Sequence, residues 1–255
     1  MVWKITFSTL WQEESKMLRL MKLEFRRNKI KTYIIASAVA GVMMTGFLFL
    51  LAYAPRIDHD ADLRMFAGYN NLISLFFMVD MAVFATLSGT MYARFIIEEY
   101  KEKRAILLFS YPVKRDRIML AKLVAVFLFV VIAMMLSSLL AFGVFGVSET
   151  IAPLVDEPLS LHTLSRALKV AIIMAIIAAE IGIMAVGIGF IKKSVPTTIL
   201  SAVALSSFFC NIMFNMTSDA NKSDAAAIIF VLVTTLAGVI VSAILMKTVN
   251  TMEVE

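Results

Sequence analysis

Six long apolar segments dominate this sequence and limit the folds that it can adopt. They contain few charged residues and occupy positions 33–54, 72–97, 120–147, 167–191, 197–214 and 225–246. A helix rises about 1.5 Å per residue, so about 20 apolar residues cross a hydrocarbon core of about 30 Å. The sequence therefore predicts an all-α integral membrane protein with six transmembrane helices.

Composition excludes the other fold classes. Hydrophobic residues make up 60% of the chain and charged residues 17%, whereas about 25% of an average soluble domain is charged. Disorder requires low hydrophobicity, and β-barrel spans alternate apolar and polar residues, unlike the continuous run at 124–136. The fifth segment is short and contains Asn211 and Asn215 near its end, so it is expected to be tilted, broken or re-entrant.

Basic residues orient the chain in the membrane. Six spans place both termini on one side, and that side carries 19 of the 24 lysines and arginines. Positive residues concentrate on the cytoplasmic side of membrane proteins. We therefore expect a multi-pass protein of a bacterial cell membrane with both termini in the cytoplasm. The net charge of +5 is explained by this topology, and no nucleic-acid partner is expected.

The first 32 residues form an expected connecting helix that lies along the membrane surface. Between residues 2 and 27, helical spacing gathers apolar side chains on one face and basic ones on the other. Aromatic residues favour the headgroup boundary, so Trp3, Trp11 and Phe25 are predicted interfacial anchors. Packing of the same face against another subunit would give the same pattern. The segment has no cleavable signal-peptide pattern.

The cytoplasmic loop at 98–119 carries the most informative pattern. Glu98 and Glu99 begin a charged helical extension of the second span, and an apolar stretch at 105–110 follows outside the bilayer. Proline ends the helix there. The apolar stretch must be buried, either in a groove of a partner protein or beneath the chain's own bundle.

This loop resembles the coupling region of type-2 ABC transporter permeases. The pattern is a pair of acids, leucines, a Ser-x-Pro-Val-x-Arg sequence and an Ala-Lys pair that enters the third span. It is carried here by Glu98, Glu99, Leu107, Leu108, Ser110, Pro112, Val113, Arg115, Ala121 and Lys122. The resemblance implies that residues of the loop, with Phe109 among them, contact a separate ATP-binding subunit. The chain has no Gly-x-x-x-x-Gly-Lys-Ser/Thr motif, so it is not expected to be an enzyme.

The resemblance also implies an assembly and a function. The organisation would be a connecting helix at 1–32, a transmembrane domain at 33–246 that encloses the coupling loop, and a tail at 247–255. Two ATP-binding subunits and a second membrane subunit, identical or different, would complete an exporter. ATP and magnesium would be bound by the partner and no cofactor by this chain. Short permeases of this kind export antimicrobial or toxic amphipathic peptides or give immunity to them. Multidrug or ion efflux is the alternative, as is a structural or sensor membrane protein.

Two acids lie within the spans. Asp80 belongs to the second span and Glu180 to the middle of the fourth. Charged residues inside a membrane usually face the bundle interior or water, so both are candidates for a translocation path, with hydrogen-bonded packing between helices as the alternative. Glycines at 182, 187 and 189 favour close helix approach. His59 and His162 are far apart, and no metal site is expected.

Overall fold

The computed structural model is almost entirely helical in the part of the chain that it describes, with short turns between the helices. The described residues are 21, 24–27, 29–57, 68–100, 115–151, 155, 160–217 and 223–251. The long helices are α2 (Lys31–Ile57), α3 (Tyr69–Tyr92), α5 (Arg115–Ile151), α6 (Leu161–Ile191), α7 (Val195–Thr217) and α8 (Ser223–Thr251), and a short π-helix, η2 (Ala93–Ile97), continues α3. Six helices are long and apolar enough to cross a membrane, which confirms the predicted fold class.

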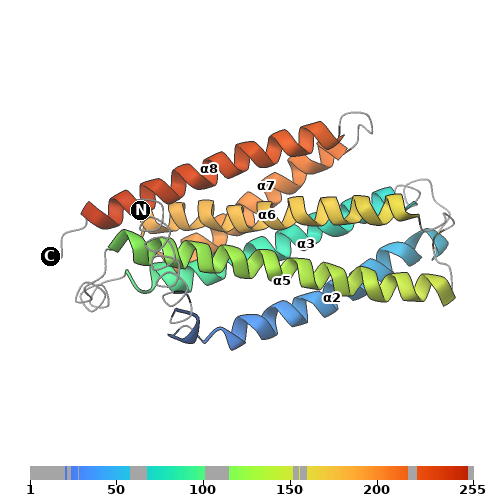
Figure 1. The fold of residues 1–255 in the computed structure, drawn as a ribbon, viewed down its shortest axis with the longest axis horizontal. Helices are drawn as coiled ribbons and strands as arrows, with labels where there is room; N and C mark the ends of the chain where they lie inside the picture. The colour runs from blue at the N-terminus through green and yellow to red at the C-terminus, as the bar shows by residue number, and fades with distance from the viewer. Residues whose placement is uncertain are drawn as a thin grey trace, which may run out of the picture.

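The helices run lengthwise along one bundle, with the start of α2 and the end of α8 at the same end (Figure 1). That end, where α2 begins and α8 ends, is called the basic end here. It carries exposed cations at 26, 29, 31, 192, 193 and 247. The shared end agrees with an even number of spans, while the side of the membrane on which it lies stays a prediction. The fifth span is an unbroken helix, α7, so the expectation of a broken or re-entrant segment is wrong.

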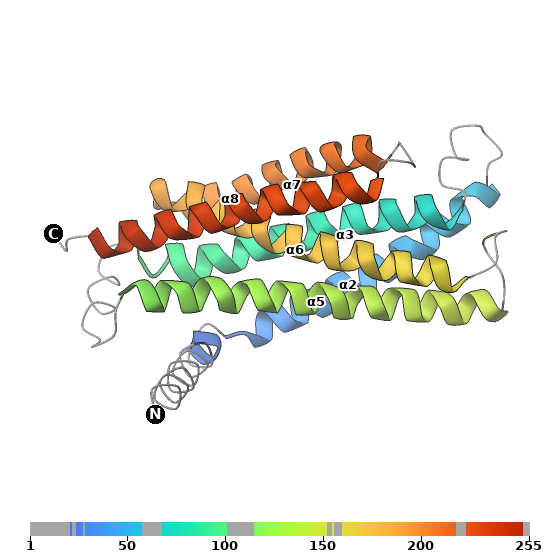
Figure 2. The ribbon, with the colours of Figure 1, turned by 45° about the horizontal axis from the view of Figure 1, so that its top comes forward.

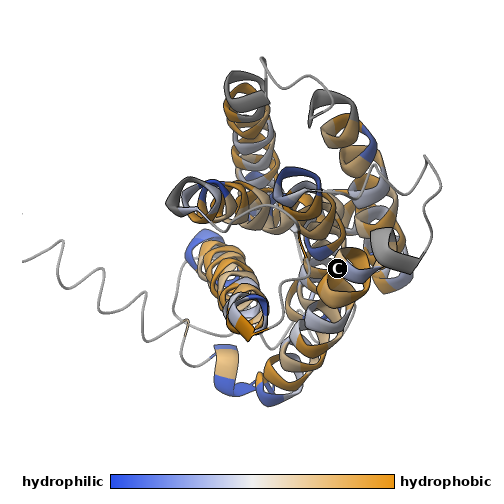
Figure 3. Ribbon diagram, turned by 90° about the vertical axis from the view of Figure 1, so that its right-hand side faces the viewer, coloured by the Kyte–Doolittle hydropathy of each residue, from blue (hydrophilic) through white to orange (hydrophobic). Residues whose placement is uncertain are grey.

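Two helices occupy the centre of the bundle. About two-thirds of the apolar stretches of α3 and α6 are buried, at 61% and 67%, compared with 17% for α8. The outer helices keep apolar residues on their free surfaces, as the end-on view shows (Figure 3). Such a surface is stable only in a hydrocarbon environment. The arrangement is therefore that of a multi-pass membrane protein.

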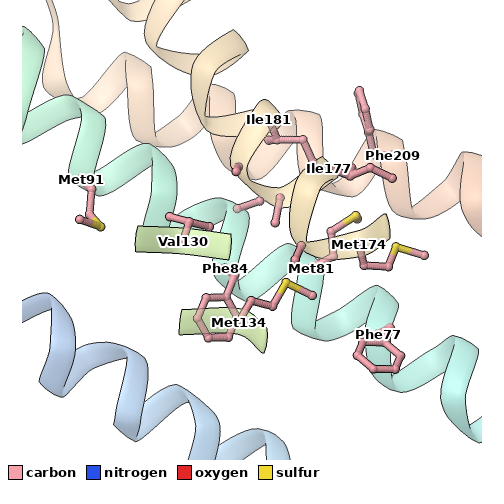
Figure 4. Close-up of a cluster of buried hydrophobic side chains, with 14 of the residues drawn as sticks. Phe77, Met81, Phe84, Met91, Val130, Met134, Met174, Ile177, Ile181 and Phe209 are labelled. Carbon is pink, nitrogen blue, oxygen red and sulfur yellow. The ribbon is translucent and has the colours of Figure 1, made fainter. Parts of the chain in front are cut away.

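Methionine and phenylalanine fill the space between the central helices. Met81 and Phe84 of α3 and Met134 of α5 have no exposed surface, and they lie in one cluster with side chains of α6 (Figure 4). Nearby, the ring centroids of Phe77 and Phe142 are 5.4 Å apart in a stacked pair. Methionine adapts its shape to irregular gaps. The many methionines of the described core thus pack as apolar filler.

Glycine permits the close approach of α3 and α6. A Cβ atom at Gly182 would overlap Ser88 of α3, and one at Gly189 would overlap Thr198 of α7. Gly187 similarly faces Val241 of α8. These contacts confirm that the glycines of the fourth span lie at helix–helix interfaces, where small residues let backbones approach.

Replacement of Gly182 should therefore destabilise the bundle. We expect Gly182→Ala to lower the free energy of unfolding by about 1–3 kcal/mol, because the methyl group forces α3 and α6 apart. Gly143→Ala on α5 is the matched control, since nothing lies within 4 Å of its Cβ position, and it should be neutral or stabilising by up to about 1 kcal/mol. Unfolding in mixed detergent micelles, followed by circular dichroism, measures both. Equal stability of the two variants would contradict the packing argument.

Candidate functional site

The two ends of the 98–119 loop meet at the basic end of the bundle. α3 passes into η2, a turn at Glu98–Tyr100 follows, and the chain is described again from Arg115, the first residue of α5. Leu107, Leu108, Phe109, Ser110 and Pro112 lie outside the described residues, as do Trp3 and Trp11. Their proposed contacts stay predictions. The described part of the site consists of the two ends of the loop and the residues packed around them, and it is called the frame here.

A π-helical turn shapes one side of this frame. The N–H of Glu98 donates to the carbonyl of Ala93 over 3.0 Å, and the N–H groups of Glu99 and Tyr100 both donate to the carbonyl of Ile96. The carbonyl of Phe95 is thereby left for a side chain, and Lys122 Nζ of α5 donates to it over 2.8 Å. π-Turns of this kind recur at functional sites. Here the turn links the end of the second span to the start of the third.

Lys122 is the centre of a buried ion cluster. It has no exposed surface, and its Nζ contacts Glu99 Oε2 directly and lies 3.4 Å from Glu24 Oε2. Arg27 completes the group, with Nη2 at 2.7 Å from Glu99 Oε1 and Nη1 at 3.9 Å from Glu24 Oε1. Two carboxylates therefore face two cations. The cluster joins three segments that are far apart in sequence.

The low polarity around the cluster makes its contacts strong. Glu24 and Glu99 are 8% and 5% exposed. Burial raises the pKa of the Glu24 carboxyl above its ordinary value, the ammonium of Lys122 opposes this, Glu99 adds to it and Arg27 opposes it. Charges held away from water require good partners, because each loses its hydration on burial. Loss of one member therefore leaves another charge buried without compensation.

Apolar contacts hold the same segment against α5. Met21 packs on Ala121 and Ala125 of α5, and Phe25 packs beside them. Phe25 is half-buried in this contact, so a protein surface as well as the expected membrane boundary surrounds it. The end of the N-terminal segment is thus fixed by the ion cluster and by this contact.

The buried carboxyl of Asp80 lies between α3 and α5. It has no exposed surface, and Ser138 of α5 donates to its Oδ2 over 3.1 Å. The same hydroxyl lies 2.8 Å from the carbonyl of Met134, and Asp80 Oδ1 has no hydrogen-bond partner among the described residues. The carboxyl takes part in contacts within this chain, and its place on a translocation path stays a prediction.

Glu180 lies on the other side of the bundle. It is 3% exposed, its Cγ is 3.7 Å from the Cβ position of Gly238 of α8, and its Oε2 has no hydrogen-bond partner among the described residues. Asp80 and Glu180 therefore contact different helices, and the described structure does not bring them together into one site.

Sequence reasoning found part of the ion cluster. Glu99 and Lys122 belong to the loop pattern, whereas Glu24 and Arg27 were not singled out. Their signal is weak, because a helical projection records both only as polar residues beside an apolar face. An acid within a strongly basic segment is the one feature that could have pointed to Glu24.

Removal of the central cation should test the cluster. We expect Lys122→Met to lower the free energy of unfolding by about 3–5 kcal/mol, because it leaves two buried carboxylates with the half-exposed Arg27 as the one remaining cation of the cluster. Unfolding in mixed detergent micelles provides the measurement. Lys247→Met, at an exposed lysine of the same end, should change it by less than about 0.5 kcal/mol.

A neutral version of the cluster separates charge from packing. Addition of Glu24→Gln and Glu99→Gln to Lys122→Met should restore most of the lost stability. Arg27 is then the one charge of the cluster that is left, and its side chain is half-exposed to solvent. A triple variant as unstable as Lys122→Met alone would contradict the electrostatic explanation.

Comparisons with known proteins agree with this architecture. The family model described as ABC-2 family transporter protein matches residues 20–211, which include the ion cluster and the loop. The chain is similar to an uncharacterized protein, YcbO, of Bacillus subtilis (strain 168), with 28% identity over 189 residues that cover 74% of this chain and 81% of the relative. No solved structure matches the chain. The chain therefore belongs to the ABC-2 family of transporter proteins, as a membrane subunit that works with an ATP-binding subunit.

Proposed function

We propose that this chain is the permease subunit of an ATP-driven exporter and that the ion cluster transmits movement from the ATP-binding subunit to the spans. The observation that carries the proposal is the position of Lys122. Its ammonium contacts Glu99 at the start of the 98–119 loop and Glu24 of the N-terminal segment, and it lies at the start of α5. Any displacement of the loop therefore acts on three segments together.

The geometry suits transmission of force. Charges that are buried and mutually paired resist separation, because each would lose its partner without regaining water. The loop is anchored at one end by Glu99 and at the other by α5, which continues as one helix from Arg115 to Ile151. A helix of that length spans about 55 Å, longer than the hydrocarbon core. A push at the loop would thus reach the far side of the membrane through α5.

The partner would be a cytoplasmic ATP-binding subunit that receives Leu107, Leu108 and Phe109 in a surface groove. Two such subunits, with ATP and magnesium, and a second permease subunit complete the proposed assembly. The support is family membership and the six spans. This chain would bind no cofactor and would leave hydrolysis to its partner.

The proposed substrate is an amphipathic peptide with antimicrobial or toxic activity. Support comes from the apolar surfaces of the outer helices, which are open to the bilayer. Asp80 and Glu180 are proposed to influence the translocation path of the substrate by their charge or hydrogen bonding. In the structure each of them contacts a neighbouring helix of the same chain. A susceptibility profile of a deletion strain against peptides, drugs and metal ions tests the substrate class. Sensitivity to drugs or ions but not to peptides would overturn it.

The docking of the loop has a direct test. We expect Leu107→Asp with Leu108→Asp to abolish co-purification of the ATP-binding subunit in mild detergent, because two charges cannot enter an apolar groove. Thr150→Asp with Ile151→Asp is the control, since both residues are exposed at the end of α5, at the opposite end of the bundle and beyond the predicted span. Complex formation that survives the loop substitutions would contradict docking.

The transmitting role of the cluster has a second test. We expect Glu99→Lys and Lys122→Glu each to uncouple ATP hydrolysis from transport while the complex still forms. Exchange of both residues together with Glu24→Lys and Arg27→Glu should recover coupling, because all four ion pairs of the cluster then again join opposite charges, and pairs in contact show interaction energies of about 0.5–3 kcal/mol. Transport and ATPase rates in proteoliposomes provide the readout. Single variants with normal coupling would overturn the transmitting role and leave docking intact.

A further inference from the structure

α2 and α5 leave an open groove on the outside of the bundle. α2 crosses α5 at an angle (Figure 2), and the space between them has a volume of about 910 Å³. Sites for small molecules have volumes of about 300–1,000 Å³. Phe25 and Met21 line the groove together with the two helices. The groove therefore extends from the membrane-spanning part of α2 to the segment that carries the ion cluster.

The shape of the groove suits a flexible chain. Its rims are exposed aliphatic side chains such as Ile34 and Leu140, and its floor has small residues. At the floor α2 and α5 are in contact, because a Cβ atom at Gly41 would lie 2.9 Å from Ser137 Oγ. A helix bound in the groove, with a diameter of about 10–12 Å, would require α2 and α5 to separate at this contact. An acyl chain is thinner and would fit without such a separation.

Cations continue the groove at the basic end. Residues 31, 34, 38, 41 and 45 share one face of α2, because they are spaced by three or four positions. The last four of these line the groove, so Lys31 lies on the groove face one turn beyond it. Arg26 and Lys29 are also exposed. None of these three cations forms an ion pair with an acid in the described part of the chain.

Lys29 occupies an unfavourable backbone conformation. Its φ angle is 48°, in the left-handed region that costs a residue with a side chain about 1–2 kcal/mol relative to glycine. This conformation occurs in the turn where Lys29 connects the N-terminal segment to α2.

We propose that the groove binds an anionic phospholipid, with an acyl chain between α2 and α5 and the phosphate at Lys29, Lys31 and Arg26. The apolar groove is continuous with the hydrocarbon core, and the cations lie where its headgroup region begins. The bound chain would contact Phe25, whose neighbours Glu24 and Arg27 belong to the ion cluster. The lipid would thus stabilise the segment that carries Glu24 and Arg27 in its position against α5. The site does not depend on the identity of the exported substrate.

Native mass spectrometry of the full chain tests the headgroup site. The purified protein is offered equal amounts of phosphatidylglycerol and phosphatidylcholine with the same acyl chains. We expect the unaltered chain to bind phosphatidylglycerol in preference to phosphatidylcholine. The double variant Lys29→Gln with Lys31→Gln should lower the affinity for phosphatidylglycerol about 25-fold, because each lysine near an anionic lipid contributes about five-fold. Lys193→Gln with Lys247→Gln is the control, because Lys193 has the same left-handed backbone, with φ 46°, in the α6–α7 turn.

A second pair of variants tests the acyl groove. Ala38 lines the groove and is exposed, so Ala38→Phe should fill the space without disturbing the core. It should lower the binding of both lipids, whereas Ala243→Phe, at an exposed alanine of α8, should leave both unchanged.

Three results would overturn the proposal. The first is equal binding of the two lipids by the unaltered chain, and the second is an equal loss with the control lysines. The third is an Ala38→Phe variant that keeps its lipid but no longer self-associates, because the groove would then be a contact between two copies of the chain.

Discussion

Hydrocarbon cannot hydrogen-bond to the peptide group, and the rest of this structure follows from that constraint. Every described span is a helix, the form in which backbone donors and acceptors satisfy one another within a segment. Hydroxyl groups obey the same rule: Thr45 donates to the carbonyl of Gly41 over 2.8 Å and Ser242 to that of Gly238 over 2.8 Å. At η2 the regular pattern of helical backbone hydrogen bonds changes, and there the ammonium of Lys122 donates to the carbonyl of Phe95.

The same constraint explains which features the sequence could predict. Length and hydropathy predicted six spans, and the structure has six helices long and apolar enough to cross a membrane, because a span must be long and apolar whatever it packs against. The close approach of α3 and α6 at Gly182 was also predictable, since glycine in a membrane helix commonly marks a place where a neighbouring helix packs closely. α5 begins at Arg115, before its predicted start at 120. The helix continues beyond the bilayer, and hydropathy does not report that part.

The ion cluster could not be predicted in the same way. Residues 24, 99 and 122 lie on three different segments, and nothing local to any of them specifies the other two. A pattern within one helix reports which face is apolar, but not which helix lies opposite. The contact between Glu24 and Lys122 depends on how the N-terminal segment is placed on α5, which is decided by packing across the whole basic end. For the loop residues 101–114 only the resemblance to known permeases offers guidance.

At the basic end, buried ion pairs and apolar contacts make different contributions to the position of the N-terminal segment. The described apolar contact of the N-terminal segment with α5 is small, with Met21 and Phe25 on Ala121 and Ala125. Such a contact between flat surfaces of small residues tolerates sliding. Paired charges in a buried place do not, because one geometry satisfies them and others leave a charge exposed to apolar surroundings. The ion cluster therefore fixes the register of the segment.

The contact of Glu180 with α8 has a consequence for the order in which the protein is made. Gly238, the α8 residue beside the Glu180 side chain, is more than 50 positions later in the chain, and translation at about 5–20 residues per second delivers it about 3–12 s after Glu180. During that interval α6 is already synthesised while its carboxyl is not yet covered by α8. α8 itself has few buried residues of its own. Biogenesis thus ends with a helix whose arrival completes the burial of an acid that an earlier helix has carried into the membrane.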